Sequence, residues 1–126
     1  FPEEEFQFEV PPPELKLNAD RTQIEQILIN LLKNAREACS RKSDKKIQVK
    51  VRRLSAGNTT LTISDNGEGI LPDVLDKIFV PFFTTKTSGS GIGLSLCKQI
   101  MTLHEGSINV KSEVGKGSSF ILTFPK

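Results

Sequence analysis

The sequence has few cysteines and histidines and no long apolar run, so it offers little from which a disulfide framework, a metal site or a membrane span could be built. Its 126 residues include two cysteines and one histidine. Cys39 and Cys97 show no CxxC spacing and no neighbouring histidine, so we interpret them as buried free thiols in a reducing compartment. No run approaches the roughly 20 apolar residues of a bilayer span, and the acidic start at residues 1–5 is unlike a signal peptide. We therefore expect a cytoplasmic domain without direct membrane contact.

The charge balance lacks a strong excess of either sign. Lys and Arg together number 17 and Asp and Glu 15, which gives a net charge of +2. Proteins that track a phosphate backbone usually carry a larger basic excess, so nucleic acid is not an expected partner. Hydrophobic residues make up 37% and charged residues 25% of the chain, as in ordinary globular domains. We expect one domain around one core.

Three consecutive prolines divide the chain near its start. Pro11 to Pro13 fit neither a helix interior nor a central strand, so they separate a short extended piece at 6–10 from the rest. The chain also begins without Met in a Phe/Glu/Pro mixture, like a domain cut from a longer protein. We expect residues 1–14 to form an extended segment and residues 15–126 to form the ordered domain.

Helical periodicity is strongest in the segment that begins near residue 20. Asp20 and Gln23 are typical of a capping box, with Asp20 as N-cap and Gln23 reaching back to it. Apolar residues then recur at helical spacing as far as Ala38. This pattern predicts an amphipathic helix of about five turns.

Two shorter helices are expected further along the chain. The first is entered at Pro72, a residue suited to the first helical turn. The second opens at the glycine run 89–93 and continues to about His104, with Gly106 as its left-handed stop.

Alternation of apolar and polar residues predicts the strands, at 47–52, 61–63, 108–110 and 120–124. The extended piece near the start brings the number to about five. The predicted fold is therefore α+β, a two-layer α/β sandwich in which a mixed sheet of about five strands carries three helices on one face.

Two asparagines stand out in the first predicted helix. Asn30 and Asn34 are four residues apart, so they share one side of the helix and border its apolar stripe. They could be two surface amides. However, Asn is a poor helix former, so two of them in one helix interior suggest a functional role. A neutral oxygen facing a cleft could complete the shell of Mg²⁺, which takes most of its charge from substrate phosphates.

A polar, glycine-containing loop at 65–69 follows a predicted strand. It could be only a tight turn. A carboxylate at the end of a buried strand, here Asp65, can also accept a hydrogen bond from an exocyclic amine such as that of adenine. A nearby glycine lets the backbone lie against the ring.

The glycine run at 89–93 fits neither the dinucleotide motif GxGxxG nor a phosphate loop with GK followed by Ser or Thr. The run could be a flexible linker. Its N–H groups at a helix N-terminus could also attract phosphate, helped by Lys86 just upstream.

Five segments together are far more specific than any one of them: NLLKNA (30–35), DNGEGI (65–70), FVPFFTTK (79–86), GSGIGL (89–94) and GKGSSF (115–120). In this order they closely resemble the N box, the first glycine box, the F box and two further glycine boxes of sensor histidine kinases. The chain resembles their catalytic ATP-binding domain, of the GHKL superfamily and its nitrogen-regulator-like branch. The resemblance spans about residues 15–124 and implies the Bergerat fold.

The resemblance implies a role for each matching residue. Asn34 would be the Mg²⁺ ligand and Asn30 its N-box companion, while Asp65 would anchor adenine. Lys86 would neutralise phosphate charge, and Ser119 would support Asp65. The other implied nucleotide contacts come from the glycine boxes and the F box: Gly67, Gly69, Ile70, Phe79, Phe83, Thr85, Gly89, Ser90, Gly91, Ile92, Gly93 and Leu94.

Two positions distinguish this chain within the superfamily. Glu37 stands where many relatives carry a basic residue that faces the phosphates, so that contact is in doubt. Asn30 stands where the ATP-hydrolysing members carry Glu as general base. Since an amide cannot take a proton from water, the position favours a kinase over an ATPase.

The resemblance implies a protein histidine kinase that transfers the γ-phosphoryl group of Mg²⁺–ATP to a histidine on a separate helical dimerisation domain of the same protein. That missing domain would precede residues 1–14, a response regulator would act downstream, and the isolated domain is expected to be a monomer. His104 is expected to interact with the end of its helix and not to accept phosphate. A nucleotide-binding regulatory module without transfer activity and a Ser/Thr kinase of the anti-sigma type remain alternatives.

Overall fold

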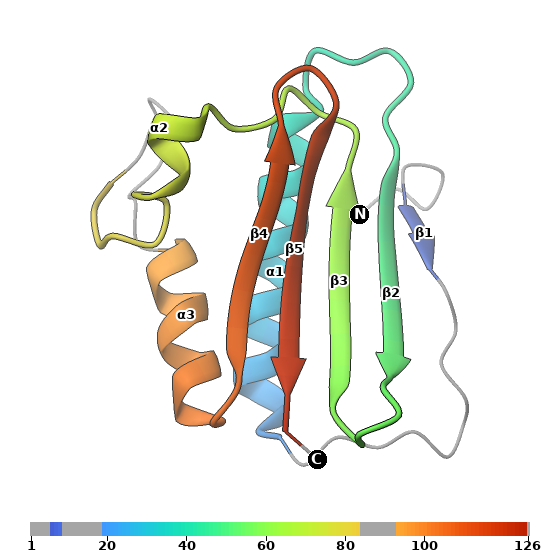
Figure 1. The fold of residues 1–126 in the computed structure, drawn as a ribbon. Coiled ribbons are helices and arrows are strands. Elements are labelled where there is room, and N and C mark those ends of the chain that lie inside the picture. Colours follow the sequence, from blue (N-terminus) through green and yellow to red (C-terminus); the bar gives the residue numbers. More distant parts are fainter. Residues whose placement is uncertain (1–5, 9–18, 84–92, 126) are drawn as a thin grey trace.

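The computed structural model describes residues 6–8, 19–83 and 93–125, whose arrangement is shown in Figure 1. Within these residues, five strands form one sheet in the order β1-β2-β3-β5-β4. They are β1 (Phe6–Phe8), β2 (Ile47–Arg53), β3 (Thr59–Asp65), β4 (Ser107–Glu113) and β5 (Gly117–Phe124). The long strands pair in antiparallel fashion, and the short β1 joins β2 in parallel. The prediction of a mixed sheet of about five strands is confirmed.

The described residues also form three helices: α1 (Arg21–Ala38), α2 (Pro72–Leu75) and α3 (Gly93–Leu103). α1 packs against β3 and β5, whereas α3 packs against α1 and β4. In Figure 1, α1 crosses behind the sheet and α3 lies on the β4 side. The predicted α+β sandwich is therefore confirmed. None of the helices in the described ranges is both long and apolar enough to cross a membrane.

The core lies between the two longer helices and one face of the sheet. α1 contributes Ile27 and Leu31 to it, while every second residue of β5 from Phe120 to Phe124 is buried. Cys39 and Cys97 are buried free thiols, which confirms that part of the cysteine interpretation. Each thiol also contacts a side-chain amide: Cys39 Sγ donates to Asn66 Oδ1 at 3.4 Å, and Cys97 Sγ accepts from Asn30 Nδ2 at 3.9 Å.

The start of α1 confirms half of the predicted capping box. The Asp20 carboxylate accepts a hydrogen bond from the Gln23 backbone N–H at 3.0 Å, which satisfies one of the donors that a helix leaves open at its N-terminus. The return bond from the Gln23 side chain was predicted wrongly. The backbone N–H of Asp20 instead donates to His104 Nε2 at 3.0 Å.

His104 thus joins the end of α3 to the start of α1. Its Nδ1 lies 2.9 Å from the carbonyl oxygen of Ile100. Since Nε2 accepts from Asp20, the proton of the neutral ring is on Nδ1, where it bonds the carbonyl. The expected contact with the end of its own helix is present, and the structure adds a second bond to α1.

The end of α3 differs from its prediction. The left-handed residue is Glu105, with φ 59°, and not Gly106. Gly106 N–H donates to the Met101 carbonyl at 2.8 Å and Glu105 N–H to the Thr102 carbonyl at 3.0 Å, the two bonds of a Schellman motif. Gly106 is needed for another reason, because a Cβ there would overlap the carbonyl oxygen of Thr123.

A left-handed Glu105 predicts a stabilising substitution. Glu105→Gly removes a Cβ from a conformation that costs an ordinary residue about 1 kcal/mol, so we expect the free energy of unfolding to rise by about 0.5–1 kcal/mol in urea titrations. Glu105→Ala is the control, since it removes the charge and keeps the Cβ. Equal stability of the Gly and Ala variants would contradict the expectation.

Candidate functional site

Segments far apart in the sequence meet at one end of the domain. The end of β3, the end of α1 and the β4–β5 turn all lie at the same end in Figure 1. Backbone hydrogen bonds join them: Glu68 N–H donates to the Ala38 carbonyl at 3.2 Å, and Gly115 N–H donates to the Glu68 carbonyl at 2.9 Å. The loop after β3 is therefore held between α1 and the β4–β5 turn.

Glycines allow this close approach. A Cβ on Gly67 would overlap the carbonyl oxygen of Ala38, and one on Gly117 would overlap that of Asp65. Gly69 has a φ of 78° and lies against the backbone of Glu113. A side chain at any of these positions would push the loop away from its neighbours.

Asp65 is partly buried at the end of β3. Its Oδ1 accepts a hydrogen bond from Gly67 N–H at 2.9 Å. Burial raises the pKa of this carboxyl above its ordinary value, while the backbone N–H groups of Gly67 and Ser118 act in the opposite direction. Such a carboxylate is fixed in orientation and incompletely solvated, which suits it to accept a hydrogen bond from a ligand.

A serine network supports the same end of the sheet. Ser112 Oγ accepts a hydrogen bond from Ile70 N–H at 2.8 Å and lies 2.8 Å from Ser118 Oγ. Ser118 is directly opposite Asp65 on β5. The network therefore connects the end of the 65–70 loop to the strand that faces Asp65.

Ser119 does not lie beside Asp65, contrary to the role that the resemblance implied. Its hydroxyl is paired with Ser64 at 2.8 Å. Since successive residues of a strand point to opposite faces, Ser119 and Ser64 share the face away from Asp65. Ser118 is the residue that sequence reasoning missed, and the alternation of buried residues through Phe120 and Leu122 was the signal that could have found it.

Asn30 lies on α1 and contacts the beginning of α3. Its Nδ2 donates to Cys97 Sγ at 3.9 Å, and a Cβ on Gly93 would lie 3.7 Å from its Oδ1. Asn34 is half-buried on the same side of α1, one turn toward the 65–70 loop. Leu94 is half-buried and packs against the core. The structure thus places the first residue of α3 beside Asn30, near the middle of α1, and Asn34 lies between Asn30 and the end of α1 that contacts the Asp65 loop.

The F-box residues reach this end from α2. Phe79 packs against the core, and the Lys98 ammonium lies 5.7 Å from the centre of its ring. Phe83 is half-buried and donates its N–H to the Val80 carbonyl at 3.2 Å. Phe82, between them, is 77% exposed and has a φ of 68°, a conformation that bulky residues rarely adopt.

Six predicted site residues lie outside the described residues: Thr85, Lys86, Gly89, Ser90, Gly91 and Ile92. Their implied phosphate contacts therefore stay predictions. In the part of the chain that the structure describes, no group of three or more His, Cys, Asp or Glu residues is arranged to hold a metal ion. A magnesium site here would take its ligands from Asn34 and from a bound phosphate.

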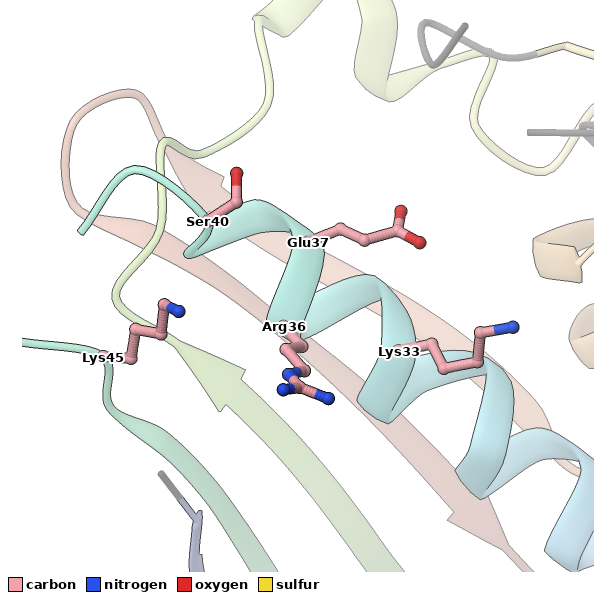
Figure 2. Close-up of a pocket in the computed structure, with 5 residues that line it drawn as sticks. All are labelled: Lys33, Arg36, Glu37, Ser40 and Lys45. Atoms are coloured by element: carbon pink, nitrogen blue, oxygen red, sulfur yellow. The ribbon is translucent and has the colours of Figure 1, made fainter. Parts of the chain in front are cut away.

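A depression of about 360 Å³ lies beside the end of α1 and is lined by Lys33, Arg36, Glu37, Ser40 and Lys45. Figure 2 shows Glu37 and Lys33 projecting to one side of α1, with Arg36 and Lys45 elsewhere around the depression. None of its lining residues belongs to the Asp65 loop or to α3. The depression therefore includes neither Asp65 nor the first turn of α3.

Comparison with known proteins gives a consistent result. A family model described as "Histidine kinase-, DNA gyrase B-, and HSP90-like ATPase" matches residues 19–126. The signal transduction histidine-protein kinase AtoS of Escherichia coli (strain K12) is 43% identical over 109 residues, which cover 86% of this chain and 18% of AtoS. The chain thus spans about a fifth of that relative.

Solved structures agree with the sequence comparison. The catalytic domain of histidine kinase ThkA matches with a TM-score of 0.83 and 38% identity over 96% of this chain and 78% of that one. Full-length ShkA in complex with AMPPNP matches with a TM-score of 0.81 and 26% identity over 95% and 25% of the respective chains. ThkA has also been solved in complex with the response regulator protein TrrA.

The raised pKa of Asp65 predicts a pH-dependent stability of the ligand-free protein. A carboxyl whose pKa is higher in the folded state stabilises the fold fully below its unfolded value of about 3.9 and loses that contribution as the pH rises through the folded value. Asp65→Asn keeps the shape of the side chain but cannot ionise. We expect its free energy of unfolding to exceed that of the parent at pH 7 and the difference to shrink toward pH 4, as measured by urea titration.

Asp76→Asn, at an exposed position at the end of α2, is the control and should show no such gap. A lower stability of Asp65→Asn at pH 7 would show instead that the hydrogen bonds to the carboxylate outweigh its burial.

Proposed function

Since the chain belongs to the family of histidine kinase-, DNA gyrase B- and HSP90-like ATPases and is homologous to sensor histidine kinase catalytic domains, we propose that it binds Mg²⁺–ATP and transfers the γ-phosphoryl group to a protein histidine. That histidine lies on a separate helical dimerisation domain of the full-length protein. The observation that carries the proposal is Asp65, a partly buried carboxylate that is fixed at the end of β3 by the N–H of Gly67.

Asp65 is proposed to recognise adenine. Its Oδ1 is already turned toward the loop by Gly67 N–H, and its remaining acceptor capacity suits the exocyclic amine of the base. Gly67 and Gly69 let the loop pack against the backbone of Ala38 and Glu113, which fixes the course of the chain beside Asp65. The complex of the similar kinase ShkA with AMPPNP supports a nucleotide ligand.

The phosphates are proposed to lie between α1 and the first turn of α3. The amide groups at the N-terminus of α3 favour negative charge, and Lys86 is proposed to add a positive charge. Asn34 would hold Mg²⁺, which neutralises the charge of the phosphates when it is bound. Asn30 cannot act as a general base toward water. Hydrolysis of ATP is therefore not promoted, and the γ-phosphoryl group stays available for transfer to a histidine nitrogen.

The protein's own contribution to transfer is positioning. The site holds the base at one end and the phosphates at the other, and this places the γ-phosphoryl group for in-line attack by a nucleophile from another domain. A response regulator is proposed to receive the phosphoryl group in turn, as the ThkA complex with TrrA supports. The regulatory-module and Ser/Thr kinase alternatives are not favoured, because the relatives are sensor histidine kinases.

Nucleotide binding provides the first test. Mg²⁺–ATP at 100 times its dissociation constant should stabilise the fold by about 2.7 kcal/mol, seen as a rise in melting temperature. Asp65→Asn should weaken ATP much more than a purine nucleoside triphosphate that lacks the 6-amino group, because the variant can present a donor to the ring amine. Equal losses for both nucleotides would contradict the adenine assignment, and no shift with the parent would overturn the proposed function.

Phosphoryl transfer provides the second test. Both nitrogens of His104 are engaged, by Asp20 N–H and the Ile100 carbonyl, so this ring is not available as an acceptor. With labelled ATP we expect no label on the isolated chain and acid-labile label on an added helical dimerisation domain that carries the acceptor histidine. His104→Gln should leave nucleotide affinity within a few-fold of the parent.

Acid-labile label on the chain that disappears in His104→Gln would overturn this assignment. Acid-stable label on the added domain would favour a Ser/Thr kinase, and nucleotide binding without any label would favour a regulatory module.

A further inference from the structure

A buried contact between α1 and α3 involves Asn30 and Cys97. Cys97 is 0% exposed, and its sulfur is 3.9 Å from Asn30 Nδ2. The other end of the same amide, Oδ1, faces Gly93, where an added Cβ would lie 3.7 Å away. The Asn30 carboxamide therefore reaches from the buried side of α3 to the first residue of that helix.

We propose that Cys97 is a positioning residue for nucleotide binding: its sulfur holds the Nδ2 end of Asn30, so that Oδ1 stays directed toward the first turn of α3. The inference rests on the proposed function, because the first turn of α3 is where the phosphates are proposed to bind. It adds a residue outside the sequence motifs to that site.

The chemistry of an amide explains why its orientation needs fixing. An asparagine side chain has donors at one end and an acceptor at the other, and rotation by half a turn exchanges them. Oδ1 can accept from phosphate-bound water or metal-bound water, whereas Nδ2 would repel a cation. In the structure Cys97 Sγ accepts from Nδ2 on the buried side, which leaves Oδ1 toward Gly93. A bond to sulfur has modest strength.

A thiol is suited to this position. Burial raises the pKa of the Cys97 thiol to about 11, so the sulfur is neutral at pH 7 and adds no negative charge near the proposed phosphates. The side chain is also small enough to pack with Ile100 and Met101 in the core of α3. Cys97 is thus an uncharged hydrogen-bond acceptor that also fits into the core.

Two substitutions separate positioning from packing. Cys97→Ser keeps an acceptor, while Cys97→Val keeps apolar bulk without one. Ile100→Val is the packing control, because it trims a buried side chain on the same face of α3. The affinity for ATP is measured by calorimetry with Mg²⁺ and with EDTA, and the Asn30 side-chain amide signals are followed by ¹⁵N NMR without nucleotide.

We expect Cys97→Val to weaken Mg²⁺–ATP by about three- to tenfold, to weaken metal-free ATP less, and to move the Asn30 amide signals. Cys97→Ser should stay within twofold of the parent in affinity, and Ile100→Val should match the parent in both measurements. In an Asn30→Ala background, Cys97→Val should have no further effect on affinity.

Parent-like Mg²⁺–ATP affinity and unmoved Asn30 signals in Cys97→Val would overturn the positioning role while leaving the proposed function intact. An equal loss in the Asn30→Ala background would also overturn it, since the loss would then come from packing. A parent that binds no nucleotide would instead overturn the proposed function and this inference with it.

Discussion

Close contact of backbone with backbone at the end of β3 is the constraint on which the rest of the site depends. The loop after Asp65 lies against the last turn of α1 on one side and against the β4–β5 turn on the other, and glycines are the only residues that allow both contacts. This arrangement holds the end of α1, the loop after β3 and the β4–β5 turn at fixed positions relative to one another. The positions of the asparagines on α1 relative to Asp65 follow from it.

The same arrangement explains why binding and stability oppose each other at Asp65. Packing the loop against its neighbours removes water from the carboxylate, and two backbone N–H groups only partly replace that water. The acceptor capacity that stays unsatisfied is a cost in the free protein, and it is the capacity that the proposed base recognition would use. A carboxylate whose hydrogen-bonding capacity was already filled by the protein would have no acceptor left for a ligand.

Local sequence patterns predicted the helices and strands well, because the spacing of apolar residues indicates which side of each element is buried. The apolar spacing of α1, the Asp20 cap and the alternation in β2 and β5 all depend on neighbours close in the sequence, and each was confirmed. The N-box and glycine-box residues could be identified from their motifs, but Ser119 was chosen over Ser118 because a motif does not state which face of a strand a residue occupies.

Other features could not be predicted because their causes are distant in the chain. The partner of the Asp20 N–H is His104, 84 residues away, and no local rule distinguishes it from Gln23. The left-handed turn falls on Glu105 because Gly106 is required at the crowded position beside Thr123, a residue of another strand. The contact of Asn30 with Cys97 likewise depends on how α1 and α3 pack.

The His104 bridge has a consequence for the cooperativity of the domain. Fraying of the last turn of α3 removes the acceptor of the Asp20 N–H and so leaves the first turn of α1 with one more open donor. The end of α3 and the start of α1 therefore stabilise each other through this bond, and opening of either end weakens the other. This joint lies at the opposite end of α1 from the end of β3, so the two helices are fastened to each other at the end remote from the proposed nucleotide site.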